Sequence, residues 1–299
     1  MRLSALLIIN PISTTFKASK IETARAMLQA AGYDVDLYRT QRNGDARNRA
    51  KEAANKTADK AYSIVFACGG DGTVNEVANG LAFSSVPMAI LPIGGSNVLS
   101  RELGSRGVVR RAIASAIDGR PRNVSLGRIR TPLETRYFTT MAGIGFDALT
   151  VYNLNKPLKR VIGVPAYVVS GIMCLLGYRT DDIILRIDGR EFNGYSAIVS
   201  KASRYGGEFR IAPEADITRA ELYIHVFQGR GRGALLRHTA GIIGGQSLKS
   251  LNGIVGRRCN NIRLTAQSHI QMDGDYFGKC TTNADIEIDV CKDALMLQF

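Results

Sequence analysis

The sequence is poor in cysteine, and no two cysteines stand in a C-x-x-C pair. Its five cysteines are scattered, at positions 68, 174, 259, 280 and 291. Without paired spacing, neither a cysteine-bound zinc site nor a disulfide framework is predicted. The first residues, MRLSALLIINP, hold a short apolar run before Asn10-Pro11, which is typical of a strand rather than of a signal peptide. We therefore expect a protein of the reducing cytoplasm.

Acidic residues are scarce relative to basic ones. The chain has 26 Asp and Glu against 39 Lys and Arg, a net charge of +13. Such a surface favours anionic partners, which include nucleic acid, lipid headgroups and nucleotide phosphates. There is no nucleic-acid recognition motif, and aromatic residues are seldom interleaved with basic ones. No nucleic-acid partner is therefore expected.

Long apolar runs are also missing, with one exception. Residues 161–178, VIGVPAYVVSGIMCLLGY, form 18 consecutive positions without a charge, which is the threshold length for a membrane span. Three glycines and Pro165 interrupt this run, and basic residues flank it on both sides. We expect a helix that is buried or lies on a membrane surface rather than one that spans the membrane.

Internal repeats and low-complexity linkers are absent, and the chain changes character near residue 121. Before this point, strand-like and helix-like patterns alternate with short connections, and Asp45 is placed to cap the second helix. Such alternation predicts a parallel sheet covered on both faces. After this point, short strands separated by turns such as Asp188-Gly189 predict an antiparallel β domain, with helices near 156–178 and 233–250. The predicted domains are residues 1–122 and 123–299, and the last residues are candidates for a return to the first domain.

A glycine-rich loop follows one of the predicted strands, in the stretch VFACGGDGTVNEV. Glycines let the backbone approach a phosphate closely, and the amide groups at the start of the next helix supply hydrogen-bond donors. Asp71 would repel a phosphate, so its expected role is to hold Mg²⁺ that bridges to the phosphates. The alternative is a purely structural turn, since Gly-Gly-Asp-Gly is also good turn chemistry.

A second loop repeats this arrangement after the next strand, in MAILPIGGSNVLSREL. Two neighbouring strand ends that each carry a glycine-rich helix start indicate one shared nucleotide site. Neither loop matches G-x-G-x-x-G or G-x-x-x-x-G-K-[ST], so a dinucleotide-binding Rossmann fold and a P-loop NTPase are both poorly supported.

These motifs together resemble those of the diacylglycerol kinase and sphingosine kinase catalytic-domain family, in particular its bacterial lipid kinases. The matching segments, in order along nearly the whole chain, are LLIINPIS, YRTQRNGDA, GGDGTVNEVANGL, LPIGGSNVLSREL, AGIGFDA, YGGEFRIAPEA and MDGD. The resemblance implies ATP-dependent phosphorylation of a lipid hydroxyl, with ATP and Mg²⁺ as cofactors. It also implies an α/β domain followed by a β-sandwich domain, with ATP in a cleft between them.

The resemblance further implies which residues contact ATP. They are Asn10, Thr40, Gly69, Gly70, Asp71, Gly72, Thr73, Val74, Asn75, Gly94, Gly95, Ser96 and Asn97. Glu76 is expected to hold the loop or cap a helix locally rather than take part in the chemistry.

Two further acids, Asp273 and Asp275, flank a glycine in HIQMDGDYFG. A tight turn brings such carboxylates close together, which suits a proton acceptor. In the family this turn reads Asp-Gly-Glu, and its last acid is the usual candidate for the catalytic base. The expected catalytic residues are therefore Asp275, Asp273 and Asp71. A hairpin turn with solvated acids is the plain alternative.

Three departures from the family pattern stand out. Gly95-Ser96 replaces Thr-Ala, which removes a threonine hydroxyl from the second loop, and Asp275 is one methylene shorter than the family's Glu. Thr218, Arg219 and Ala220 replace an Asp-Asp-Gly that contributes to a structural Mg²⁺ site in some bacterial members, so we predict that this site is absent. Weakened activity is left open by these changes.

Two other functions are kept as alternatives. NAD kinases and phosphofructokinase-like sugar kinases share the Gly-Gly-Asp-Gly loop, and a lipid-binding protein of the same fold could have lost catalysis. In the favoured reading the protein acts on a lipid at the membrane surface, binds anionic headgroups and associates peripherally with the membrane. The identity of the lipid is not predicted, and a homodimer is left open.

Overall fold

The computed structural model describes residues 3–56, 61–105, 107–153, 183–207, 209–229, 231–243, 247–265, 267–280 and 286–299. The chain forms two compact units, Met1–Leu126 with Lys292–Phe299, and Gly127–Cys291. The predicted domain boundary lies after residue 122. The apolar segment 161–178 falls outside the described residues. Among the residues that are described, no helix is long and apolar enough to cross a membrane.

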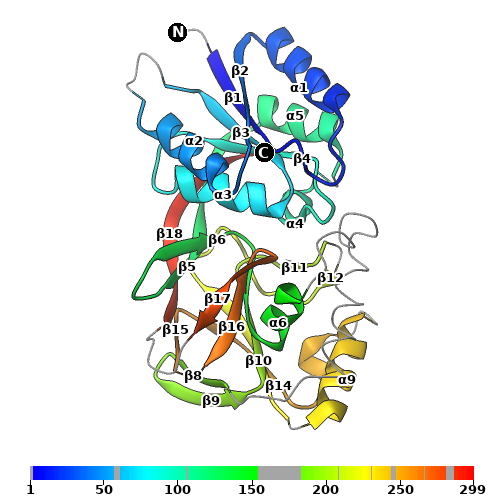
Figure 1. The fold of residues 1–299 in the computed structure, drawn as a ribbon, viewed down its shortest axis with the longest axis vertical. Helices are drawn as coiled ribbons and strands as arrows, with labels where there is room; N and C mark the ends of the chain where they lie inside the picture. Colours follow the sequence, from blue (N-terminus) through cyan, green and yellow to red (C-terminus); the bar gives the residue numbers. More distant parts are fainter. Residues whose placement is uncertain are drawn as a thin grey trace. The chain divides into compact units, whose positions relative to one another are not determined.

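The first unit is built on a parallel sheet. Its strands are β1 (Leu3–Ile9), β2 (Tyr33–Arg39), β3 (Ile64–Gly69) and β4 (Met88–Pro92), in the order β2-β1-β3-β4 (Figure 1). The three pairings between them are all parallel. The end of the last strand, β18 (Ile286–Gln298), pairs with β4 through Leu297 and Met88. The final residues of the chain therefore belong to this unit.

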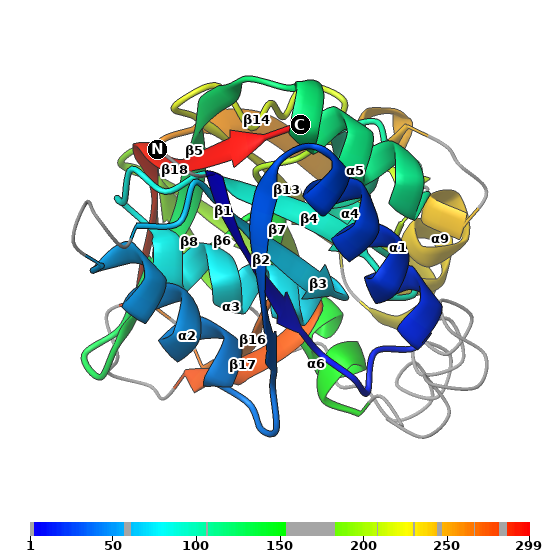
Figure 2. The same cartoon turned by 90° about the horizontal axis from the view of Figure 1, so that it is seen from above.

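Helices cover both faces of this sheet. They are α1 (Ala18–Ala30), α2 (Asp45–Ala54), α3 (Asp71–Leu81), α4 (Val98–Glu102) and α5 (Val109–Asp118). Helices α1 and α5 lie on one face and α2 and α3 on the other (Figure 2). On the α1/α5 face, Leu7, Phe66 and Leu91 of three neighbouring strands are buried against Ile21 and Ile113 of the helices. The predicted parallel α/β architecture is confirmed.

The start of α2 differs from the prediction for Asp45. Helix α2 begins after Gly44, which has a left-handed conformation and provides no side-chain cap. The Asp45 carboxylate instead accepts the backbone N–H groups of Gln41 and Arg42, at 2.9 and 3.1 Å. Asp45 therefore fixes the turn before the helix, and the prediction that it caps the helix is wrong.

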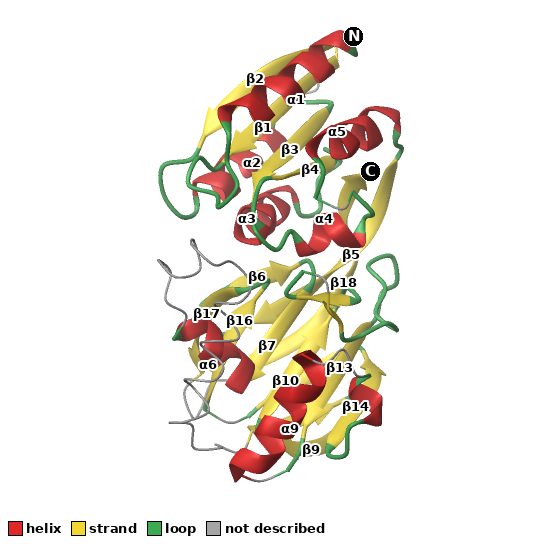
Figure 3. Cartoon of the chain, turned by 90° about the vertical axis from the view of Figure 1, so that its right-hand side faces the viewer, coloured by secondary structure: helices red, strands yellow, loops and turns green. Residues whose placement is uncertain are grey.

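The second unit is an antiparallel β sandwich (Figure 3). One sheet has the order β14-β13-β10-β7-β16-β17, and every pairing in it is antiparallel. Its strands are β14 (Ile254–Cys259), β13 (Leu222–Phe227), β10 (Ser196–Ser200), β7 (Met141–Gly145), β16 (Ser268–Met272) and β17 (Asp275–Cys280). The facing layer contains the first part of β18 with β15 (Asn261–Leu264), β8 (Ile183–Ile187), β9 (Arg190–Gly194), β5 (Pro121–Arg130) and β6 (Thr135–Phe138).

Smaller elements complete this unit. They are the helices α6 (Phe146–Tyr152) and α9 (Gly231–Ile243), the 3-10 helix η1 (Leu248–Ser250), and the short strands β11 (Arg204–Tyr205) and β12 (Phe209–Arg210). Helix α9 and η1 lie in the stretch near 233–250 for which a helix was expected. The helix expected near 156–178 lies outside the described residues.

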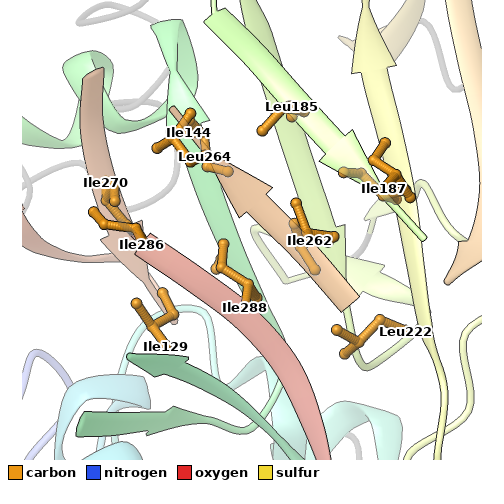
Figure 4. Packing of buried hydrophobic residues seen from close by; sticks show 14 of the residues in the cluster. Ile129, Ile144, Leu185, Ile187, Leu222, Ile262, Leu264, Ile270, Ile286 and Ile288 are labelled. Atoms are coloured by element: carbon orange, nitrogen blue, oxygen red, sulfur yellow. The ribbon is translucent and has the colours of Figure 1, made fainter. Parts of the chain in front are cut away.

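The sandwich is held by a core of branched aliphatic side chains from both sheets. Figure 4 labels Ile144, Leu222 and Ile270 of one sheet and Ile129, Leu185, Ile187, Ile262, Leu264, Ile286 and Ile288 of the other. These residues alternate with more exposed ones along strands such as β8, whose burial alternates strictly. The period of two that predicts half-buried strands therefore also places the core of this unit.

A buried histidine in β13 makes the stability of this unit sensitive to acid. His225 is 1% exposed, and burial lowers its pKa to about 4, an effect that the nearby charge of Glu214 partly opposes. Below the pKa of an unfolded histidine, about 6.5, the unfolded chain takes up a proton that the folded chain refuses. Stability should therefore fall as the pH drops from about 6.5 towards 4.

We expect the wild type to lose about 2 kcal/mol of unfolding free energy through His225 between pH 7 and pH 5. Urea unfolding at the two pH values measures this loss, and His225→Gln should remove it. His269→Gln serves as the control, because His269 is only partly buried. An unchanged pH dependence in His225→Gln would contradict the assignment.

Candidate active site

Three loops meet at the carboxyl ends of β1, β3 and β4 in the first unit. The backbone N–H of Asn10 donates to the carbonyl of Cys68 (2.9 Å), and its side-chain Nδ2 donates to Oγ1 of Thr73 (3.1 Å). The N–H of Ile93 donates to the carbonyl of Gly69 (3.3 Å). Asn10, the first glycine loop and the second glycine loop are thus brought together, as the sequence predicts for neighbouring parallel strands.

The glycines allow the two loops to touch through their backbones. A Cβ atom on Gly94 would overlap the Cα of Gly70, and it would lie 2.9 Å from Oδ1 of Asn97. A Cβ on Gly69 would overlap the side chain of Thr73. These glycines are therefore required by the packing of the site itself, in addition to any approach of a ligand.

Asp71 joins the two loops through its side chain. Its Oδ1 accepts the backbone N–H of Val98, the first residue of α4, at 2.6 Å. Asn97 closes the second loop on itself, because its side chain accepts from the N–H of Gly94 (3.0 Å) and donates to the carbonyl of the same residue (2.9 Å). Asp71 is half-buried, so its side chain joins the two loops and is still partly accessible to solvent.

This packing predicts different effects for neighbouring glycines. Gly94→Ala should lower nucleotide affinity by roughly tenfold or more and destabilise the unit by about 2 kcal/mol, because a side chain would push two backbones apart. Gly95→Ala is the matched control for stability, since its Cβ would meet only Oγ1 of Thr14, at 4.0 Å. Isothermal titration with ATP and thermal melting measure both effects. Equal melting temperatures of the two variants would contradict this account of the loops.

The other predicted contact residues lie in mixed surroundings. Thr73, Val74 and Asn75 in the first turns of α3 are all buried. The side chain of Asn75 accepts from Nδ2 of Asn79 (3.1 Å) in its own helix. Thr40 follows β2, where its N–H and hydroxyl both donate to the carbonyl of Ile9.

Ser96 lies near the surface of the second loop, beside exposed Gly95. Its carbonyl accepts from Nε of Arg101 (2.8 Å). Arg101 therefore fixes this loop from α4, a role that no sequence pattern indicated.

Glu76 holds a neighbouring helix rather than the phosphate loop. Its carboxylate accepts the backbone N–H groups of Gly44 (2.9 Å), Ala46 (3.1 Å) and Arg47 (3.4 Å) at the start of α2. A carboxylate at a helix N-terminus satisfies amide groups that have no partner within the helix. Glu76 therefore caps a helix, but the helix is α2 and not its own, so the expectation that it acts locally is wrong.

The same end of the sheet has the features of an anion site. The first amide groups of α3, from Asp71 onward, have no acceptor within the helix and form its positive end. Nearby, Nζ of Lys20 donates to the carbonyl (2.9 Å) and hydroxyl (3.1 Å) of Thr15, and that hydroxyl donates to the carbonyl of Gly94 (3.5 Å). Lys20 is a cation that sequence reasoning missed, because no motif marks it.

A resident metal is not supported by the donor set. No group of three or more His, Cys, Asp or Glu side chains gathers at one point among the described residues. Asp71 supplies one carboxylate beside the two loops, so a metal here would have to be held mainly by the phosphates of a nucleotide.

In the second unit, Asp273 is held by a cradle of donors. Its carboxylate accepts the backbone N–H and the hydroxyl of Thr139 (2.7 and 2.8 Å), the same two groups of Thr140 (2.8 and 2.7 Å), and the N–H of Met141 (3.0 Å). The side chain is 6% exposed. Five donors saturate the oxygens of a carboxylate, so this geometry fits an anchor for the turn.

Asp275 differs from Asp273 in exposure. It is the first residue of β17, and it is exposed. The structure therefore separates two acids that the sequence presents as a pair: Asp273 faces the segment 139–141, whereas Asp275 lies at the surface.

The buried carboxyl group of Asp147 supports the turn between Asp273 and Asp275. Asp147 of α6 accepts from the hydroxyl of Tyr205 (2.5 Å) and from Nε2 of Gln271 (2.7 Å). Oε1 of Gln271 in turn accepts the N–H of Gly274 (2.9 Å). Gly143 leaves room for this contact, because a Cβ there would overlap the Asp147 carboxyl group.

Burial raises the pKa of Asp147, and the hydrogen bonds from Tyr205 and Gln271 lessen that rise. Asp147 lies in AGIGFDA, one of the segments that carry the family resemblance. The sequence therefore marks the segment that contains Asp147, but it does not show that Asp147 is linked to the Asp-Gly-Asp turn through Gln271.

Comparison with protein families identifies both units. Residues 4–129 match the model described as the diacylglycerol kinase catalytic domain. Residues 140–297 match the model of the YegS C-terminal domain, described as NAD kinase beta sandwich-like. The chain belongs to the diacylglycerol kinase family.

Bacterial members of the diacylglycerol kinase family are similar along almost the whole chain. The diacylglycerol kinase of Bacillus subtilis (strain 168) is 28% identical over 283 residues, which cover 92% of this chain and 90% of that protein. The diacylglycerol kinase of Staphylococcus haemolyticus (strain JCSC1435) is 28% identical over 302 residues, which cover 95% and 85%.

Solved structures agree on the fold. A diacylglycerol kinase from Bacillus anthracis str. Sterne has a TM-score of 0.73 at 20% identity, covering 99% of this chain and 96% of that one. Yeast NADH kinase, solved in complex with NADH, has a TM-score of 0.52 at 9% identity, covering 100% and 84%. The fold of this chain is thus similar to that of both structures, and fold alone does not separate their substrates.

Proposed function

We propose that the protein transfers the γ-phosphate of ATP to the hydroxyl group of a membrane lipid, and that the lipid is diacylglycerol. The observation that carries the proposal is the order of the two family models, which match residues 4–129 and 140–297 as a catalytic domain and its sandwich partner. Curated relatives that match over at least 90% of this chain are named for diacylglycerol.

The first unit supplies the nucleotide-binding groups in this proposal. The two glycine loops let phosphates approach the backbone, and the start of α3 offers amide donors. Lys20 adds positive charge. Mg²⁺ bound together with ATP would supply neutralisation of the phosphate charge. Asp71 would contact that metal while keeping its hydrogen bond to Val98, so one side chain both shapes the loops and meets the ion.

The second unit supplies the proton acceptor. Asp275 would accept the proton of the lipid hydroxyl as its oxygen attacks phosphorus, and its exposure is compatible with access by a bulky substrate. Asp273 would not take part in proton transfer, because its oxygens already accept five hydrogen bonds. Its role is to fix the turn that presents Asp275, together with the Asp147–Gln271–Gly274 chain of hydrogen bonds.

Membrane contact follows from the substrate. Diacylglycerol exposes its hydroxyl at the bilayer surface, so the protein would bind there peripherally, and the net charge of +13 favours anionic headgroups. Each basic residue near such a surface contributes about 1 kcal/mol, and salt screens this attraction.

The decisive experiment offers radiolabelled Mg·ATP with one acceptor at a time. The acceptors are dioleoylglycerol in phosphatidylglycerol-containing vesicles, sphingosine or ceramide in the same vesicles, and NAD in solution. We expect label in phosphatidic acid, with Asp275→Asn as the inactive control.

Each other outcome has a clear meaning. Label in a sphingolipid would replace diacylglycerol as the substrate and keep the lipid kinase. Label only in NADP would overturn the lipid assignment. Binding to vesicles without turnover on any acceptor would favour a lipid-binding protein that has kept the fold.

A further inference from the structure

A lysine is fully buried in the second unit. Lys201 follows β10, and its side chain is 0% exposed. Its Nζ donates to two backbone carbonyls, those of Asp216 (2.5 Å) and Arg219 (2.8 Å). A buried ammonium group costs several kcal/mol unless hydrogen-bond acceptors and opposite charge surround it. The observed contacts therefore point to a specific function for this side chain.

The loop around the ammonium group of Lys201 arranges its backbone carbonyls as the ligands of a cation site are arranged. The Asp216 carboxylate accepts the N–H (2.9 Å) and hydroxyl (2.7 Å) of Thr218, and the N–H of Arg219 donates back to the Asp216 carbonyl (3.3 Å). This turn directs the carbonyls of residues 216 and 219 at one point, which Nζ of Lys201 occupies. Converging carbonyl oxygens are the usual ligands of hard cations in proteins.

The charges nearby suit a cation at neutral pH. Burial lowers the pKa of Lys201 to about 8, and the negative charges of Asp216 and Glu221 limit that decrease. The side chain is therefore still protonated at pH 7. Arg219 also lies 3.6 Å from the Asp216 carboxylate, so the acid of this loop already has positive partners.

These residues do not fit a divalent metal. Thr218, Arg219 and Ala220, which follow Asp216 in this loop, carry no carboxylate, and Lys201 already uses two carbonyls of the loop. We propose that residues 216–219 form a cation site whose cation is the ammonium group of Lys201. The Lys201 side chain then stabilises the loop as a bound metal ion would. This proposal does not depend on whether the chain phosphorylates a lipid.

The site is connected to the turn that carries Asp275. The backbone N–H groups of Lys201 and Ala202 both donate to the carbonyl of Thr140, at 2.7 and 3.0 Å. Thr140 also donates its N–H and hydroxyl to Asp273. One residue thus links the cation site with the cradle of the turn, so loss of the cation should loosen both.

Chemical rescue tests the proposal without nucleotide or lipid. Lys201→Ala should lower the melting temperature by roughly 5 °C or more, and n-propylammonium chloride should restore much of that loss by placing an ammonium group in the cavity. Tetramethylammonium chloride, which has no N–H donor, should not. Lys201→Met should be destabilised and not rescued, and Lys292→Ala, whose side chain is 76% exposed, should resemble the wild type.

Several results would overturn the proposal that Lys201 supplies the cation of this loop. Wild-type melting temperatures in both Lys201 variants would do so, and so would equal rescue by the two salts. A rise of the wild-type melting temperature in millimolar MgCl₂ that Asp216→Asn abolishes would show that a metal does occupy the loop.

If neither variant folds, the native protein decides the question. Acetylation of lysines followed by mass spectrometry should modify Lys201 roughly tenfold more slowly than Lys292, because the buried amine reacts only after local opening. Equal rates would mean that the ammonium group is not held in the site.

Discussion

Asp275→Asn should reduce lipid phosphorylation by roughly 10²–10⁴-fold and leave the melting temperature close to that of the wild type. Asparagine has nearly the same shape as aspartate, but it cannot accept the proton of the attacking hydroxyl. Because Asp275 is exposed, solvent screens interactions of its charge, and we expect the substitution to change stability little. Initial rates with saturating Mg·ATP and diacylglycerol vesicles, measured beside thermal melting, separate these two effects.

Asp273→Asn provides the matched control two residues away. It puts an amide NH₂ group among five donors from residues 139–141, so two donors would face each other inside the protein. We expect a loss of about 2–4 kcal/mol of unfolding free energy. Any loss of rate should then follow from instability, and cooling should recover part of it. Similar stability in both variants, or full activity in Asp275→Asn, would contradict the division of roles.

Asp273 and Asp275 also show where sequence reasoning stops. The pattern Asp-Gly-Asp predicts a tight turn with two acids, and the turn is there, with Asp273 in a left-handed conformation. The pattern contains nothing about residues 139–141, which lie more than 130 positions away and provide all five donors. Contacts between distant segments decide which acid is anchored and which is exposed.

The architecture itself was predictable because its signals are local. Alternating strand and helix patterns in the first part, and strands with period-two burial such as β8 in the second, specify the two kinds of unit. The same holds for the glycine loops after β3 and β4, since parallel strands place their carboxyl ends side by side. What no local pattern shows is that Gly70 and Gly94 touch.

Long-range capping was equally hidden. Asp45 has the position of a helix cap and does not act as one, whereas Glu76 caps α2 from a separate helix. In the same way, no pattern near Lys201 in the sequence predicts that the carbonyls of residues 216 and 219 bind its ammonium group. Each of these roles depends on packing between segments that a single sequence does not pair.

Asp71 is the residue for which substitution distinguishes two roles in one side chain. Asp71→Asn keeps an oxygen that can accept the N–H of Val98, and it removes the negative charge. If the charge holds the metal that accompanies ATP, this variant should fold normally and lose activity by roughly 10²-fold or more. Its remaining activity should require a higher Mg²⁺ concentration than the wild type, which a magnesium titration of the initial rate measures.

Asp71→Ala removes the acceptor as well as the charge, leaving the Val98 amide group without this partner. It should therefore lose about 1–3 kcal/mol of stability in addition to the activity, and nucleotide affinity should fall with it. If Asp71→Asn is as active as the wild type, the charge has no catalytic role and Asp71 serves only to join the loops. If the Asn and Ala variants lose stability equally, the hydrogen bond to Val98 is not what couples them.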